Sequence, residues 1–330
     1  MPIGASTPVA TKPVLTLLQP APKPVSKNIV SALPREPSAS RSKSENSDAK
    51  NNLHSNLFKN WEKMADVSSV TSLTPQTIAK EAFQKGDFLM ATAALKDQSQ
   101  TGSPEWKFAN RILESVEQGI REKLPTALKE LNRFSEKNKF DARELKWIEF
   151  LAGKDVEGLR YKNCQAFRND TDNKLEGNHD YVQVVFPSWS PSRYFNKDLY
   201  ISRNVKTWKA LLKDCPNIRR NIQLNMQLNA IRMLHFWKFH FAFQGDRVIL
   251  EDNSQSPLHE DGNHNTLRAT RFIRALRMFR CRSLLNVFKI LLEEHYKNSS
   301  SYQKWSDELK KPGHLISVTW AEPLVQKVIR

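Results

Sequence analysis

The stretch LEGNHDYVQVVFP, residues 175–187, and its downstream partner HNTLRATRFIRALRMFR, residues 264–280, carry the clearest structural signals in this sequence. In the second stretch, helical geometry of about 100° per residue gathers the apolar positions and one asparagine into an arc of about 120°. The pattern predicts a helix with this arc in the core and four arginines spread over its remaining surface. The arc holds Asn265, Ala269, Phe272, Ile273, Leu276 and Phe279, and the arginines are Arg268, Arg271, Arg274 and Arg277.

The first stretch fits two kinds of secondary structure. As a strand, alternation would place Tyr181, Gln183 and Val185 on one face. As a helix, His179 and Gln183 would share one face, and the apolar residues of 181–186 would form the other. Pro187 closes the stretch in either case.

Three motifs, taken in order, resemble the conserved domain of the opioid growth factor receptor family. They are H-D-Y-V-Q-V-V-F-P at 179–187, R-M-L-H-F-W at 232–237 and H-N-T-L-R-A-T-R at 264–271, and the resemblance covers residues 150–295. The chain departs from the family at Val184 and Val185, where Trp and Leu are usual, and at Lys238, where Gly is frequent.

The resemblance implies an all-α domain and favours a helix in the first motif. It also implies a non-enzymatic binding protein with opioid growth factor receptor activity. Eukaryotic members of the family are membrane-associated, perinuclear or nuclear-associated receptors for an enkephalin peptide. A peptide or protein ligand would meet the polar residues of the motifs, which are His179, Tyr181, Gln183, Asn265, Arg268 and Arg271.

Each group of these residues also has a structural interpretation. His179 or Gln183 can close a buried hydrogen-bond network by pairing with Asn265. The arginines of the second stretch can form a solvated face, pair with Glu293, Glu294 or the N-terminal helices, or bind an anion.

Charge and cysteine content narrow the classes of partner and compartment. The chain has 330 residues, 51 Lys and Arg against 35 Asp and Glu, and a net charge of +16. This excess favours acidic partners, which are an acidic protein, an anionic membrane surface or nucleic acid. Nucleic acid is the least expected of the three, because the sequence has no compact basic cluster with interleaved aromatic residues. Three widely spaced cysteines, Cys164, Cys215 and Cys281, favour a reducing, intracellular and cytoplasmic location.

The part of the chain before residue 150 divides in two. Residues 1–70 are rich in Pro, Ser, Lys and Asn, and we expect a disordered leader. Residues 75–150 are predicted to form an accessory region of about four helices, because Thr74-Pro75, Ser103-Pro104 and Asp141 with Glu144 are capping patterns. The piece at 82–95 resembles one tetratricopeptide helix pair, so a repeat scaffold stays an alternative.

Residues 150–311 are predicted to form the main helical domain of an irregular bundle, followed by a tail at 312–330. Beyond 264–280, the expected helices are 205–213, 217–243, 284–295 and 302–311. The run at 217–243 is apolar on almost every side, which is typical of a central helix. Residues 153–177 read as loop with one short helix, and 244–262 as a polar loop.

The sequence shows no motif of a catalytic, metal or cofactor site. His259, Glu260, Asp261 and His264 lie close together but lack helical ligand spacing, so we expect no metal and no cofactor. The sequence has no nucleophile or phosphate-loop motif, no apolar run of roughly 18 residues and no basic segment of a Sec signal. Two hypotheses follow: a binding module of the family named above, or a basic helical interaction scaffold.

Overall fold

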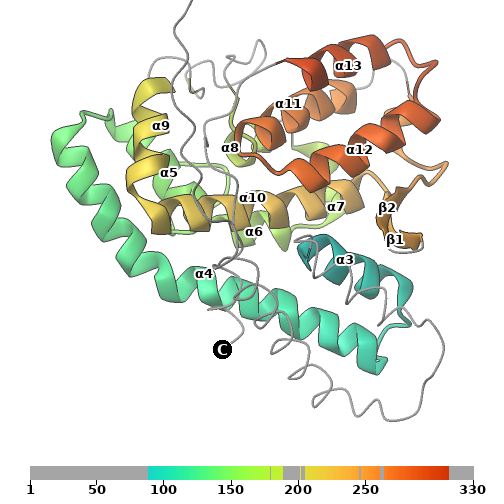
Figure 1. Cartoon of the computed structure of the whole chain (residues 1–330), viewed down its shortest axis with the longest axis horizontal. Coiled ribbons are helices and arrows are strands. Elements are labelled where there is room, and N and C mark those ends of the chain that lie inside the picture. Colours follow the sequence, from blue (N-terminus) through green and yellow to red (C-terminus); the bar gives the residue numbers. More distant parts are fainter. Residues whose placement is uncertain are drawn as a thin grey trace, which may run out of the picture. The chain divides into compact units, whose positions relative to one another are not determined.

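The computed structural model describes residues 88–178, 180–188, 201, 205–244, 247–260 and 264–311. Within them the chain forms eleven α-helices, one 3-10 helix and a two-stranded sheet, so the predicted mostly helical class is confirmed (Figure 1). The predicted leader, the Thr74-Pro75 cap, residues 82–87 and the tail lie outside the described residues. The first six helices are α3 Phe88–Gln98, α4 Pro104–Lys137, α5 Ala142–Leu151, α6 Cys164–Arg168, α7 Asp172–Gly177 and α8 Tyr181–Val185.

The second half adds five α-helices, one 3-10 helix and the sheet. They are α9 Val205–Asp214, α10 Pro216–Phe236, β1 His240–Gln244, β2 Arg247–Glu251, η2 Pro257–His259, α11 His264–Met278, α12 Arg282–His295 and α13 Tyr302–Lys310. Four of the predicted helices, those at 205–213, 264–280, 284–295 and 302–311, are therefore confirmed. The first motif is helical, as the resemblance implied, and the 153–177 region holds two short helices instead of one.

Side-chain caps set the starts of α4 and α5. The Ser103 side chain accepts a hydrogen bond from the Trp106 amide, and the Asp141 side chain accepts one from the Glu144 amide. Both caps were predicted. Helix α4 then continues for 34 residues with Pro125 inside it. No helix among the described residues combines the length and apolar character needed to cross a membrane.

Helix α10 lies at the centre of the fold and packs against α4, α5, α6, α9 and α11 (Figure 1). Four asparagines of α10 recur at every fourth position. Two of them donate side-chain hydrogen bonds to backbone carbonyls of the surrounding chain. Asn221 donates to Ile120 and Ala152, and Asn225 donates to Leu151. At the start of the helix, the Glu130 carboxylate accepts from the backbone and side chain of Asn217. The first three members of the asparagine ladder, which is Asn217, Asn221, Asn225 and Asn229, thus tie α10 to α4 and to the end of α5, while Asn229 accepts a hydrogen bond from Arg168 of α6.

The prediction of one helix over 217–243 is wrong in its last quarter, because α10 stops at Phe236. Lys238 adopts a left-handed conformation with φ 64. The Lys238 amide donates to His235 O, and the Phe239 amide donates to Leu234 O, which together form a Schellman motif. Glycine is the usual residue at this position. The position where the resembled family often has Gly is therefore the position that ends the helix.

An antiparallel hairpin follows, in which Phe241 faces Leu250 and Phe243 faces Val248. Its Phe241 amide donates to the Asp97 carboxylate of α3, 2.9 Å away. The run at 239–243 has an aromatic residue at every second position, a strand pattern that the uniformly apolar composition concealed. The 244–262 segment, predicted as polar loop, supplies the second strand.

One continuous hydrophobic core extends from α3 to α13. Trp147 of α5 donates its indole N–H to Val184 O of α8, and its ring packs edge-on against Trp208 of α9. Residue 150 therefore lies inside this core, and α3, α4 and α5 are built into the same packing as the later helices.

We expect Lys238→Gly to be more stable than Lys238→Ala by about 1 kcal/mol, because only the alanine keeps a Cβ in the left-handed conformation. Both changes remove the ion pair between Lys238 and Asp172, so that contribution cancels. Urea unfolding of the two variants measures the difference. Equal stabilities would contradict the assignment of Lys238 as the helix-ending residue.

Candidate functional site

The first and last motifs meet around the side chain of Arg268. This arginine lies on α11, and its side chain is only 5% exposed. Its Nη2 donates to the backbone oxygens of Leu175, Glu176 and Asn178 at 3.3, 3.4 and 2.8 Å. The first two carbonyls belong to the last turn of α7, which has no helical partners for them. Arg268 therefore fastens the start of the first motif onto α11.

The middle motif joins the same cluster through aromatic rings. The Arg268 guanidinium lies 5.2 Å from the Tyr181 ring centroid and 5.8 Å from that of Phe236. Both distances fit cation–π contacts. Tyr181 is fully buried, stacks on Phe167, and has a pKa raised mainly by burial. Residues of all three motifs thus surround one cation.

Asn265 is also fully buried and has several partners. Its Oδ1 accepts from Arg268 Nη1 at 2.9 Å and from Trp237 Nε1 at 3.3 Å, and its Nδ2 donates to Glu176 at 3.4 Å. The predicted pairing with Gln183 is not formed. The other predicted partner, His179, lies outside the described residues.

Gln183 differs from the other motif residues. Its side chain is buried at 4% exposure, and its Oε1 has no hydrogen-bond partner among the described residues. A buried, unpaired carbonyl oxygen costs about 1–3 kcal/mol. Gln183 is therefore the described motif residue whose hydrogen-bonding capacity the core leaves unused.

The remaining arginines of α11 do not form a solvated face. Arg271 donates to Phe186 O at 2.9 Å, and burial together with the neighbouring Arg274 lowers the pKa of Arg271 to about 9. Arg274 and Arg277 both bind Glu308 of α13, not Glu293 or Glu294. Burial alone would raise the pKa of Glu308, but Arg274 and Lys311 outweigh it and lower that pKa to about 2. Arg274 thus already holds an anion, the Glu308 carboxylate of the chain itself, while Arg277 binds the backbone oxygen of the same residue.

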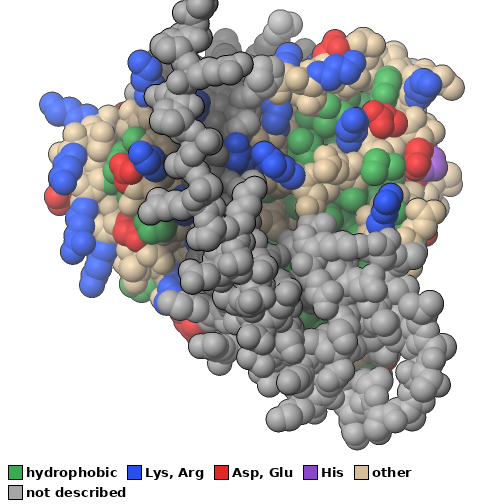
Figure 2. All heavy atoms as spheres, in the orientation of Figure 1, with side chains coloured by type: hydrophobic (Ala, Val, Ile, Leu, Met, Phe, Trp, Pro, Cys, Tyr) green, Lys and Arg blue, Asp and Glu red, His purple; other side chains and the backbone are tan. Residues whose placement is uncertain are grey.

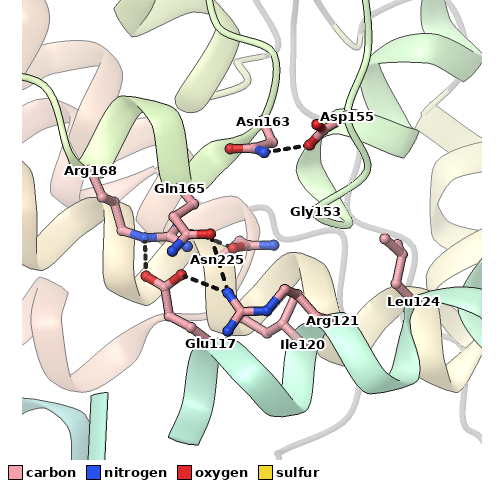
Figure 3. Close-up of a pocket in the computed structure, with 10 residues that line it drawn as sticks. All are labelled: Glu117, Ile120, Arg121, Leu124, Gly153, Asp155, Asn163, Gln165, Arg168 and Asn225. Atoms are coloured by element: carbon pink, nitrogen blue, oxygen red, sulfur yellow. Dashed lines mark hydrogen bonds and ion pairs between the residues drawn. The ribbon is translucent and has the colours of Figure 1, made fainter. Parts of the chain in front are cut away.

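A pocket of about 330 Å³ lies elsewhere, between α4, the turn after α5, α6 and α10 (Figure 3). In Figure 3, Glu117 lies between Arg168 and Arg121, while Asp155 and Asn163 face them from the other side. Leu124 and Ile120 provide apolar surface along α4. The lining consists of Glu117, Ile120, Arg121, Leu124, Gly153, Asp155, Asn163, Gln165, Arg168 and Asn225.

Arg168 organises the polar end of this pocket. Its side chain is 10% exposed, and its Nε donates to Glu117 at 2.9 Å. Its Nη1 donates to Asn225 at 3.1 Å and to Asn229 at 2.8 Å. Sequence reasoning did not identify this site. The available signal was the four-residue repeat of asparagines on α10, a row of amides in an otherwise apolar helix.

The two histidines considered for a metal site lie in different places, since His264 opens α11 and lies 2.8 Å from Glu176, while His259 belongs to a separate structural cluster. His259 Nε2 lies 2.8 Å from the Asp252 carboxylate, and its ring stacks on Tyr296 at 4.7 Å between centroids. Asp261 lies outside the described residues, and the described part of the chain has no group of three or more residues arranged to hold a metal. The three cysteines are free and buried, and burial raises the pKa of the Cys164 thiol to about 11.

Comparisons with protein-family models, curated proteins and solved structures give no match for this chain.

We expect Arg268→Met to destabilise the protein by about 3 kcal/mol, because the carbonyls of 175–178 would lose their charged donor. Asn265→Leu should reduce this cost, and the two changes should be coupled by about 1 kcal/mol or more. Urea unfolding of the single and double variants measures the coupling. Arg274→Met with Asn265→Leu is the control, since these two residues share no partner among the described residues, and this pair should be additive. Additivity at 265 and 268 would refute the cluster.

Proposed function

We propose that this chain is a non-enzymatic binding protein related to the opioid growth factor receptor conserved domain. In this proposal the motif cluster is the conserved framework, and a short peptide of the enkephalin type is the ligand. The ligand contacts those residues of the first motif whose side chains form no hydrogen bond within the motif cluster.

The observation that carries this proposal is the convergence of the three motifs on Arg268. Tyr181 comes from the first motif, Phe236 from the second, and Arg268 with Asn265 from the third. The hydrogen bond from Arg271 to Phe186 O joins the third motif to the first across 85 residues, and the bond from Trp237 to Asn265 joins the second to the third across 28. Chance matches scattered along a sequence have no reason to gather around one side chain, so the convergence supports a shared structural origin.

Gln183 provides the support for a binding role. A buried acceptor without a donor reduces stability, and such costs concentrate at functional sites. In this proposal a donor from the ligand, such as a peptide N–H or a tyrosine hydroxyl, pairs with the side-chain oxygen of Gln183, which has no donor among the described residues.

Isothermal titration calorimetry of the full chain with Met-enkephalin tests this function. We expect a saturable heat for the native chain and its loss in Gln183→Leu. The same variant should melt at an equal or higher temperature, because it removes an unpaired buried oxygen.

Gln223→Leu is the matched control for the peptide experiment. Gln223 is a second buried glutamine whose Oε1 also has no partner among the described residues, but its Nε2 donates to Phe279 O at 2.9 Å. This control should melt at a lower temperature and still bind. A native chain that gives no heat would refute the receptor hypothesis, and binding that survives in Gln183→Leu would place the ligand elsewhere.

A basic surface supports a second candidate function, an interaction scaffold for an acidic partner. In Figure 2, Lys and Arg side chains project along the left margin of the view, where the C-terminal half of α4 runs in Figure 1. Glu130 of α4 binds Asn217, which follows the end of α9 by three residues. The end of α9 therefore lies beside α4. We define the basic face as the exposed residues Lys129, Arg133, Lys137, Lys139, Lys206, Lys209 and Lys213, which form no ion pair with the described residues.

Sedimentation with anionic and neutral vesicles tests this second candidate. Each Lys or Arg near an anionic surface contributes about 1 kcal/mol, so reversing Lys129, Arg133 and Lys137 to Glu should abolish binding to the anionic vesicles. Reversal of Lys297, Lys304 and Lys310, which are equally exposed, is the control and should retain most of it. Equal losses in both triple variants would show that only net charge matters. Binding to an oligonucleotide but not to vesicles would identify nucleic acid as the acidic partner.

A further inference from the structure

We infer that the pocket between α4, α6 and α10 is a binding site for a small zwitterion with an aliphatic portion, of the size of a dipeptide. This site shares no residue with the motif cluster, and the inference does not depend on the peptide function proposed above.

The first argument is the unused donor capacity of Arg168. Three acceptors, Glu117, Asn225 and Asn229, fix the guanidinium through Nε and Nη1. Its Nη2 forms no hydrogen bond with the described residues, although the side chain is nine-tenths buried and lines the pocket. A guanidinium held in this way is preorganised to bind a carboxylate. The side-chain amide of Gln165, whose oxygen accepts from Arg121 at 3.2 Å, adds a second donor group beside it.

The second argument is the balance of charge around the pocket. Two arginines, Arg121 and Arg168, are matched by two carboxylates, Glu117 and Asp155. The pocket therefore has no net charge that would favour a simple anion or a simple cation. Asp155 lies at the end opposite Arg168 in Figure 3, and its side chain is 65% exposed, lies 3.8 Å from Lys162 Nζ and accepts a hydrogen bond from Asn163. A ligand with a carboxylate at one end and an ammonium at the other matches this separation of charge.

The third argument concerns size and apolar surface. Ligand sites are typically about 300–1,000 Å³, so this pocket of about 330 Å³ suits a ligand much smaller than a pentapeptide. Ile120 and Leu124 give the middle of the ligand an aliphatic surface. Gly153, with φ 102, closes the wall, because a Cβ there would come within 3.0 Å of Ile120 and 3.2 Å of Asn225.

Calorimetry of the full chain with leucyl-leucine tests the inference. We expect saturable binding that weakens at least about tenfold when the ammonium is acetylated, and to a similar extent when the carboxylate is converted to an amide, because each change removes one charge-assisted contact. A native chain that does not bind, or blocked dipeptides that bind as well as the parent, would overturn the inference.

Two matched variants locate the site. Asp155→Asn should weaken binding about tenfold, while Glu157→Gln should leave it unchanged. Both residues are exposed acids of the same turn, but only Asp155 lines the pocket. Unchanged binding in Asp155→Asn would overturn the assignment even if the dipeptide binds. Since Gln183→Leu leaves this pocket intact, failure of the enkephalin experiment and failure of this one are distinguishable.

Discussion

The buried guanidinium of Arg268 is the interaction on which the second half of this fold depends. It supplies donors to the carbonyls that α7 leaves unpaired, across about ninety residues of sequence. A cation is also favourable at the negative end of a helix. With Tyr181 and Phe236 against its faces, the charge is removed from water without losing its polar partners. It acts together with Lys238, whose ion pair with Asp172 also holds α7, and with Trp147, whose indole N–H binds Val184 O of α8.

Local patterns in the sequence predicted most of the local structure. The buried arc of α11 and the caps at Ser103 and Asp141 depend on residues within one or two helical turns, so periodicity and capping rules suffice for them. The end of α10 was missed because the run from 217 to 243 is apolar on almost every side, and the spacing of its apolar residues does not show where the helix stops. The signal lay in the resemblance, where Lys238 occupies a position that is often glycine.

Longer-range partners could not be read from sequence in the same way. Glu308 binds Arg274 across 34 positions, and Arg168 binds Asn229 across 61. No local rule links such residues, since the pairing follows from how the helices pack. The predicted site residues illustrate the consequence. Tyr181, Asn265 and Arg268 were selected because they are polar members of motifs, and the fold uses them to join its own segments.

The asparagine ladder on α10 has a further consequence for how this helix finds its register. A repeat of four residues nearly matches one helical turn, about 5.4 Å, so sliding α10 by one turn brings each amide to the place of its neighbour. The ladder alone therefore allows two alignments of similar hydrogen bonding. Only a group that occurs once can distinguish the two alignments. The Glu130 carboxylate, which accepts hydrogen bonds from the first turn of α10, is such a group. Glu130 therefore fixes the position of α10 along its axis, and the hydrogen bonds of the asparagine ladder stabilise that alignment.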